Sequence, residues 1–159
     1  MRPDVLSMSE VDDVGYTVGV FQDVEWADRG LEALARHGFP TEAISVMTKE
    51  SQTAIELIKK TFGTEGRSFD VRGIGTVVAH GTLIEKLQGD EGGLERIGVA
   101  RSIARAGFQI HDGFIFENLT AKGGVLVAIH TEARAADALS VLHSYGGGNA
   151  AIGAWKGRV

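Results

Sequence analysis

Apolar and polar positions near the start of the chain follow the order of a strand, a helix and a second strand. Residues 16–21 (YTVGVF) are apolar and β-prone, and Asp23 stands where a helix N-cap is expected. The apolar residues that follow recur at helical spacing, and glycine and proline then end the helix: Ala27, Leu31, Leu34, Gly38 and Pro40. Residues 44–48 alternate like a short strand. The pattern predicts a β-α-β unit over residues 16–48.

A shift of 108 residues reproduces this pattern without a gap, with a strand at 125–129, a cap at Thr131 and a helix stop at Gly146. Six residue pairs are identical: Ala27/Ala135, Leu31/Leu139, Leu34/Leu142, Gly38/Gly146, Ala43/Ala151 and Ile44/Ile152. They fall on the helix stripe, the helix stop and the second strand. Two such units, at 16–48 and 124–156, predict an α+β fold of ferredoxin-like type. It is a double β-α-β sandwich, in which a four-stranded antiparallel sheet carries two helices on one face.

The residues between the two units, 50–123, are too many for a connection and are expected to form a helical, glycine-rich insertion. Apolar spacing predicts helices over 53–62 and 91–106, with Gly98 on the apolar face of the second helix. The run 75–80 (GTVVAH) fits either a strand or a buried helix. The insertion therefore carries structure of its own.

A last helix of the insertion is expected immediately before the second unit. It would begin with Asp112 as its N-cap and run through Lys122. Ile115 and Leu119 are expected to face inward.

Length and composition indicate one domain over residues 15–159, preceded by a mobile acidic tail at 1–14. The 159 residues are enough to bury a core, and 43% are hydrophobic. The tail holds four acids against one base: Asp4, Glu10, Asp12 and Asp13 against Arg2. No signal peptide or transmembrane pattern is found, so we expect a cytoplasmic protein.

Charge and cysteine content narrow the function classes. The net charge of −5 argues against binding to nucleic acid or to anionic lipid. Cysteine is absent, which excludes disulfides, a thiol nucleophile and thiolate metal ligands. No complete phosphate-binding glycine motif and no nucleophile-elbow motif occurs, so no cofactor is predicted.

Several short apolar and glycine-based motifs resemble a known family. They are the runs Val18-Gly19-Val20-Phe21, His37-Gly38-Phe39-Pro40, Ile44-Ser45-Val46, residues 73–81 (GIGTVVAHG) and residues 122–128 (KGGVLVA). With these motifs, the chain resembles the YflT-like general stress protein family, also described as heat-induced stress proteins, over most of residues 16–155. The resemblance implies a role in bacterial stress responses. The family offers no established catalytic residues that could be transferred to this chain.

The chain departs from this family in its central stretch. In many relatives the stretch is a smooth Gly/Ala/Leu run that resembles paired membrane-embedded or tightly packed helices. Here charged residues interrupt it: Glu85, Lys86, Asp90, Glu91, Glu95, Arg96, Arg101 and Arg105. We therefore expect no stable membrane insertion.

The five histidines are the candidates for metal binding or base chemistry near neutral pH, and none is paired at metal-binding helical spacing. His37 and His143 are expected to close the two repeat helices. His111 forms the nearest acid–base cluster, with Asp112 and Glu117, and the flanking Phe114 and Phe116 could desolvate it. Both acids have ordinary structural roles as well: Asp112 is expected to be the N-cap, and Glu117 is expected to be a solvated residue on the helix. No catalytic residue and no metal site are therefore predicted.

Two tryptophans are candidate interface residues. Trp26 lies in the first turn of the first helix, off its apolar stripe, and Trp155 ends the last strand. Exposed aromatic side chains often anchor a partner, although both residues could instead cover the edge of the sheet.

These observations favour a non-catalytic stress-response protein that forms a homo-oligomer or binds a protein partner. The alternative is a regulatory domain that binds a small molecule in a pocket between sheet and insertion. That pocket would be lined by Phe114, Phe116, Trp155 and a histidine, His111 being the first candidate. An enzyme built around His111, Asp112 and His130 ranks below both.

Overall fold

The two predicted β-α-β units are present in the computed structural model, which describes residues 15–105, 109–130, 134–144 and 152–154. The first unit consists of β1 (Tyr16–Phe21), α2 (Val24–Arg36), a 3-10 turn η1 (Thr41–Ala43) and β2 (Ile44–Lys49). The second consists of β5 (Val125–His130), α7 (Ala135–Ser144) and β6 (Ile152–Ala154). The predicted cap at Thr131 and stop at Gly146 lie outside the described residues.

Local signals begin and end α2 where the sequence predicts. The Asp23 carboxylate accepts a hydrogen bond from the backbone N–H of Trp26 at 2.9 Å, which satisfies one of the free donors of the first turn. His37 is the C-cap residue, and its ring nitrogen Nδ1 lies 2.8 Å from the carbonyl oxygen of Ala33. The expected structural role of His37 is therefore confirmed.

The insertion contains both helices and strands. Its elements are α3 (Gln52–Phe62), β3 (Arg67–Val71), β4 (Gly75–His80), α4 (Thr82–Gln88), α5 (Gly93–Arg105) and α6 (Ile110–Ala121). The ambiguous run at 75–80 is the strand β4. The strand β3 was not predicted, because its side chains are mostly exposed and its sequence, RSFDV, is largely polar.

The strands within the described ranges form one six-stranded antiparallel sheet in the order β3-β4-β2-β5-β1-β6. The four expected strands are consecutive in this order and pair antiparallel. The expected number of four strands was wrong, because two strands of the insertion extend the sheet to six. The strand β4 pairs with β2 from Val46↔His80 to Lys49↔Val77, and β3 pairs with β4.

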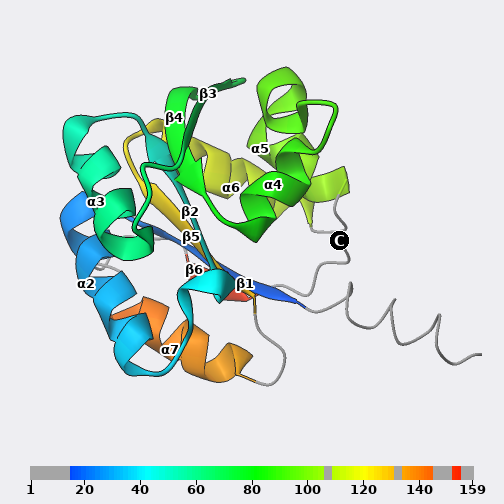
Figure 1. Cartoon of the computed structure of the whole chain (residues 1–159). Helices are drawn as coiled ribbons and strands as arrows, with labels where there is room; N and C mark the ends of the chain where they lie inside the picture. The colour runs from blue at the N-terminus through cyan, green and yellow to red at the C-terminus, as the bar shows by residue number, and fades with distance from the viewer. Residues whose placement is uncertain (1–14, 106–108, 131–133, 145–151, 155–159) are drawn as a thin grey trace, which may run out of the picture.

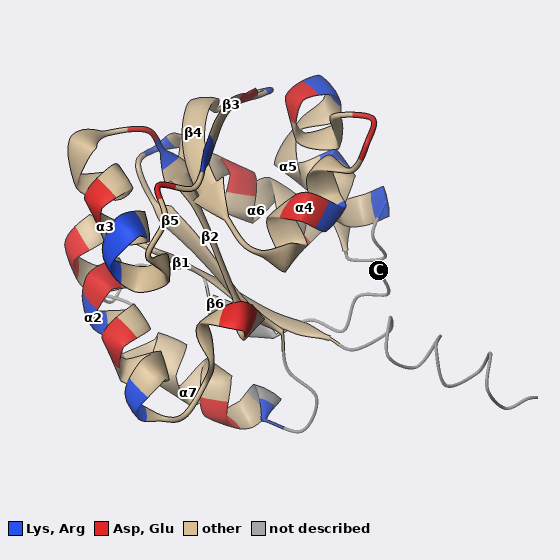
Figure 2. Cartoon of the chain, in the orientation of Figure 1, with Lys and Arg blue, Asp and Glu red and all other residues tan. Residues whose placement is uncertain are grey.

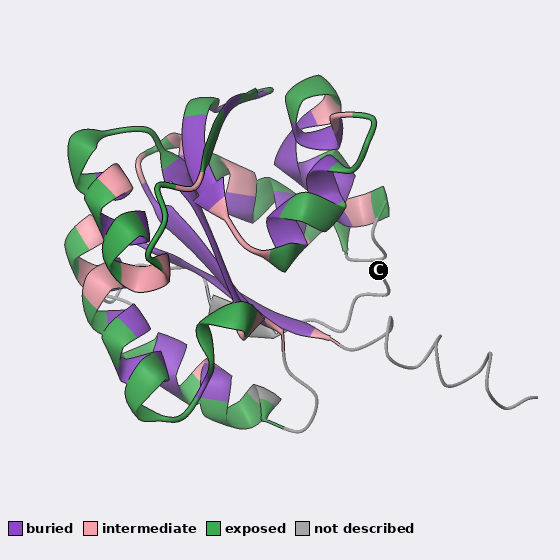
Figure 3. Cartoon of the chain, in the orientation of Figure 1, coloured by how far each residue is buried: buried purple, intermediate pink, exposed green. Residues whose placement is uncertain are grey.

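Helices cover both faces of the sheet (Figure 1). One face carries α2, α3 and α7, and the other carries α4, α5 and α6. Alternate residues of β1 enter the two cores: Val18 and Val20 face the α4–α6 layer, and Phe21 faces the α2 layer. The central strands β1, β2 and β5 are therefore buried on both sides, as Figure 3 shows. The two helices of the repeated units, α2 and α7, share one face as expected, and the insertion supplies a second helical layer on the other face.

The α5 helix is broken at Gly98, whose φ of 84° lies in the left-handed region. A Cβ at this position would lie 2.8 Å from the carbonyl oxygen of Arg72, so only glycine fits there without a shift. Beyond the break, the Glu117 carboxylate accepts a hydrogen bond from the backbone N–H of Ala100 at 3.1 Å. Glu117 is half-buried and supports the start of a helical segment, in contrast to the solvated role expected for it.

The α6 helix begins at Ile110, with Gln109 as an N-cap residue that makes no side-chain capping bond. The expected cap at Asp112 is therefore wrong, since Asp112 lies in the first turn. Ile115 is 38% exposed, whereas Phe116 is buried, so the inward direction expected for Ile115 is also wrong. The second error has a clear cause: α6 has large apolar residues on both its buried and its exposed sides, so apolar spacing selects no single face.

No helix in the described part of the chain has the length and apolar character needed to cross a membrane.

Candidate association surface on helix α6

Large apolar side chains that remain exposed in the described residues gather on α6. They are Ile110 at 45%, Phe114 at 48% and Ile115 at 38% exposure. Polar residues at the same helical spacing complete this side, and none of its members is acidic. We call this side the α6 face; it consists of the exposed residues Ile110, His111, Phe114, Ile115, Asn118 and Lys122.

The opposite side of α6 fixes the orientation of the helix. Gly113, Phe116 and Thr120 are buried there, and Phe116 belongs to the core that α6 shares with α4, α5 and the sheet. A Cβ on Gly113 would lie 2.9 Å from the Cα of Ala100, so the missing side chain lets the α5 backbone approach closely. This contact forces the α6 face outward.

The predicted ligand-binding residues do not meet in one place. His111 and Phe114 are both exposed on the α6 face, whereas Phe116 is only 3% exposed and points into the core. The two phenylalanines therefore lie on opposite sides of one helix and do not line a common pocket. Trp155 lies outside the described residues, so its predicted ligand and interface roles stay predictions.

Trp26, the other predicted interface residue, is half-buried. It packs against the core cluster of the α2 layer, and the guanidinium carbon of Arg29 lies 5.0 Å from the centre of its ring. Its interface role stays a prediction.

His130, which was weighed as part of an enzyme site, stacks on the ring of Tyr16 with centroids 4.7 Å apart. Tyr16 is itself buried, and burial raises the pKa of its phenol, while a hydrogen bond with Thr82 at 3.4 Å acts in the opposite direction. The described contacts of His130 are thus those of an aromatic packing partner at the end of β5.

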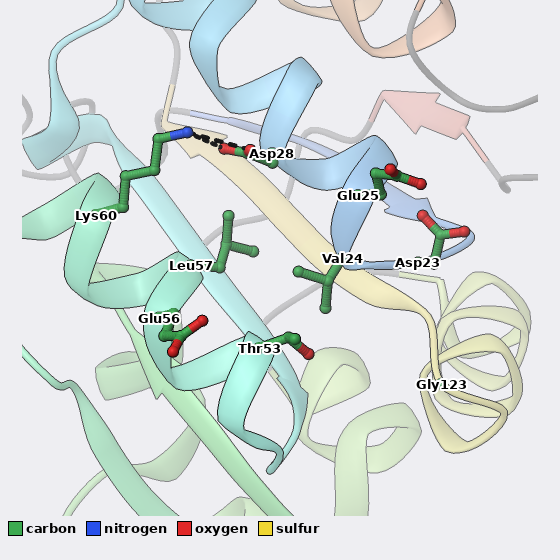
Figure 4. Close-up of a pocket in the computed structure, with 9 residues that line it drawn as sticks. All are labelled: Asp23, Val24, Glu25, Asp28, Thr53, Glu56, Leu57, Lys60 and Gly123. Atoms are coloured by element: carbon green, nitrogen blue, oxygen red, sulfur yellow. Dashed lines mark hydrogen bonds and ion pairs between the residues drawn. The ribbon is translucent and has the colours of Figure 1, made fainter.

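A second surface feature is an open groove of about 640 Å³ between α2 and α3 (Figure 4). Val24 and Leu57 supply its apolar part. Carboxylates line it as well: Asp23, Glu25, Asp28 and Glu56. Sequence reasoning missed this groove, because its two helices are about 30 residues apart in the chain and only packing brings their acids together.

Lys60 is the basic residue among those that line the groove, and two carboxylates engage it. Its Nζ atom lies 2.9 Å from an oxygen of Asp28 and 2.9 Å from an oxygen of Glu32. The hydrogen bond with Lys60 lowers the pKa of Glu32, and the bonds to Glu32 and Asp28 raise the pKa of Lys60. These contacts link α2 to α3 at the protein surface.

A third feature is an open hollow of about 560 Å³ between the start of β2 and the start of α4. It contains His80, whose ring lies against that of Phe62 with centroids 4.4 Å apart. Thr41, Thr82 and Lys86 add further polar groups. The hollow lies between sheet and insertion, where the alternative function places a pocket, but its lining differs from the predicted one.

The part of the chain that the structure describes contains no group of three or more histidine, aspartate or glutamate residues placed to hold a metal ion. Of the three features, the α6 face is the one that exposes large apolar side chains. No family model, no curated protein and no solved structure matches this chain.

Proposed function

We propose that this protein is a non-catalytic, cytoplasmic protein of the stress-response type, and that it acts by self-association or by binding a protein partner through the α6 face. The observation that carries the proposal is the exposure of Ile110, Phe114 and Ile115 on one helix. Large apolar side chains that gather on a surface are typical of sites where proteins meet.

The pattern of α6 supports this proposal independently of the exposure values. A helix with apolar residues on all sides is typical of one that is buried on all sides. Among the residues that the structure describes, α5 and the sheet pack against the side that contains Gly113, Phe116 and Thr120. A second protein would cover the rest.

The stress-response part of the proposal rests on the family resemblance alone. The strand order β6-β1-β5-β2 supports the proposal that the two β-α-β units form a ferredoxin-like core. Such domains often associate, which fits the proposed mode of action.

Native mass spectrometry and sedimentation of the purified chain test the proposal. We expect masses above 16.9 kDa whose share grows with concentration, and we expect Phe114→Ser to reduce that share. Lys59→Ser, at an exposed position on α3 in the other layer, is the matched control and should leave the share unchanged. A chain that stays monomeric at every concentration and carries no bound protein would contradict the proposal.

The hollow at His80 favours a second candidate function, the binding of a small molecule by a regulatory domain. Its volume is in the range of known ligand pockets, and several polar groups converge on it. A small added mass in the native spectrum that is lost in His80→Gln and retained in Phe114→Ser would favour this function over the first.

A further inference from the structure

We infer that the partner of the α6 face is α6 of a second copy of this chain, packed antiparallel about a two-fold axis at the level of Phe114 and Ile115. This inference rests on the proposed function and specifies the partner and the geometry. Its evidence is the charge pattern of the face and the position of the apolar residues along it.

The charge pattern permits two copies to meet at this surface. The chain has a net charge of −5, so two copies of it repel each other overall. The α2–α3 surface is an example: Asp28 and Glu56 line its groove together with Lys60, and Figure 2 shows acidic segments on both helices. The α6 face has no acidic member, and its two flanking acids, Asp112 and Glu117, are half-buried. Like-charge repulsion between acids is therefore smallest where the apolar side chains are exposed.

The positions of the polar residues select the antiparallel orientation. In a parallel pair, Lys122 of one copy would lie beside Lys122 of the other, and two positive charges would meet. In an antiparallel pair centred between Phe114 and Ile115, the two Lys122 residues lie at opposite ends, roughly 22 Å apart along the helix axis. His111 of each copy then lies opposite Asn118 of the other, and the two side chains can form a hydrogen bond. Phe114 and Ile115 of both copies then lie at the centre of the contact.

The size of the face sets the strength of the contact. Stable interfaces bury about 800 Å² on each partner, and one helix face with three exposed large apolar side chains offers less. The pair therefore belongs to the weak, transient class, and the share of dimer should depend steeply on concentration over the micromolar to millimolar range.

Engineered cysteines test the geometry cleanly, since the chain has none of its own. Ile115→Cys places a thiol next to the proposed axis, and Lys122→Cys places one at the far end of the same face. Across a close helix pair, facing Cα atoms come within the range that a disulfide needs. Under mild oxidation we expect Ile115→Cys to form a disulfide-linked dimer at least ten times faster than Lys122→Cys.

A mixture tests the register. His111→Cys mixed with Asn118→Cys should form a mixed dimer faster than either variant forms a dimer with itself. Equal rates for Ile115→Cys and Lys122→Cys, or a mixed dimer no faster than the two self-dimers, would overturn the antiparallel geometry.

The remaining outcomes separate this inference from the proposed function. Association that falls in Phe114→Ser while Ile115→Cys fails to cross-link would overturn the inference and leave the proposed function standing. A different protein bound to the native chain, whose amount falls in Phe114→Ser, would assign the face to that protein and overturn the inference as well. A monomer with no bound protein and no cross-link would overturn both.

Discussion

Helices α2 and α6 lie on opposite faces of the same sheet, and they differ in how completely the chain buries their apolar residues. The buried side of α2 holds Ala27, Gly30, Leu31, Ala33 and Leu34. Its exposed side is polar, and an aspartate caps its start. The α6 helix buries a comparable side but leaves three large apolar residues exposed, and no side chain caps its start.

The comparison shows which part of the fold a single copy can stabilise by itself. Burial of apolar surface is the main favourable term in folding, and α2 obtains its full share from the core that it forms with α3, α7 and the sheet. The α6 helix obtains part of this term from one side alone. That difference supports the proposal that association, rather than chemistry, uses the α6 face.

The largest effect should come from truncating the buried side of α2. Leu34 is fully buried, so Leu34→Ala should lower the free energy of unfolding by about 2–5 kcal/mol. Phe114→Ala, at the exposed side of α6, should change the stability of the monomer by less than about 0.5 kcal/mol. Urea unfolding followed by circular dichroism at low protein concentration measures both. Similar losses in the two variants would mean that Phe114 is covered within one copy, which contradicts the comparison.

A smaller effect is expected at the break in α5, which lies against α6. Gly98→Ala places a Cβ 2.8 Å from the carbonyl oxygen of Arg72 and 3.0 Å from a carboxylate oxygen of Glu117, at a positive φ. Gly63→Ala is the matched control, because φ is 76° there and nothing lies within 4 Å of the added carbon. We expect Gly98→Ala to cost about 1–3 kcal/mol more than Gly63→Ala in urea unfolding. Equal losses would show that only the backbone angle matters.

Substitutions at the N-cap positions of the two helices should change the free energy of unfolding by about 1 kcal/mol in opposite directions. Asp23→Ala removes the bond to the Trp26 N–H and should destabilise the chain by about 0.5–2 kcal/mol. Gln109 has the extended backbone of a cap without a capping bond, so Gln109→Asp should stabilise it by about 0.5–1 kcal/mol. Thermal unfolding of both variants measures the pair. No gain from Gln109→Asp would show that the start of α6 is already satisfied by another group.

Elements with local signals were predictable from the sequence, and those that depend on distant contacts were not. Asp23 and Gly38 mark the ends of α2 by their own chemistry, and the repeat then locates the second unit. The break at Gly98 has no such signal, because the Arg72 carbonyl and the Glu117 carboxylate that surround it come from other elements. Because these contacts are invisible in the local sequence, the spacing of apolar residues predicted one continuous helix over 91–106, without the break.

The candidate site was predictable only in part. His111, Phe114 and Phe116 were predicted to line one pocket, but His111 and Phe114 are exposed on one side of α6, and the sequence could not show that Phe116 faces away from them. The contact between Gly113 and the α5 backbone decides that direction, and it is a tertiary contact. The alternation of apolar and polar residues also could not show that β3 and β4 extend the sheet, because β4 is apolar on both faces at its centre.

The smallest effect concerns the ion pairs that join α2 to α3. Lys60 lowers the pKa of Glu32, so the ionised carboxylate is favoured in the folded state. This contribution is present at pH values above 4.5, the ordinary value for a glutamate, and is lost as the pH falls through the lowered value. Lys60→Met should therefore flatten the loss of stability below pH 4.5, by an amount that added salt reduces, because all three side chains are solvent-exposed.

The stability of the protein at alkaline pH provides an independent check of the Lys60 ion pairs, with its own control. The raised pKa of Lys60 contributes stability that is present below pH 10.5 and is lost as the pH rises further. Burial of Tyr16 raises its pKa above 10.0 and adds a loss in the same range, so Tyr16→Phe is needed to separate the two. Melting temperatures from pH 3 to pH 11 should show Tyr16→Phe altering only the alkaline limb and Lys60→Met altering both. A Lys60→Met profile parallel to that of the unmodified chain at both ends would show that these exposed pairs contribute nothing to the contact between α2 and α3.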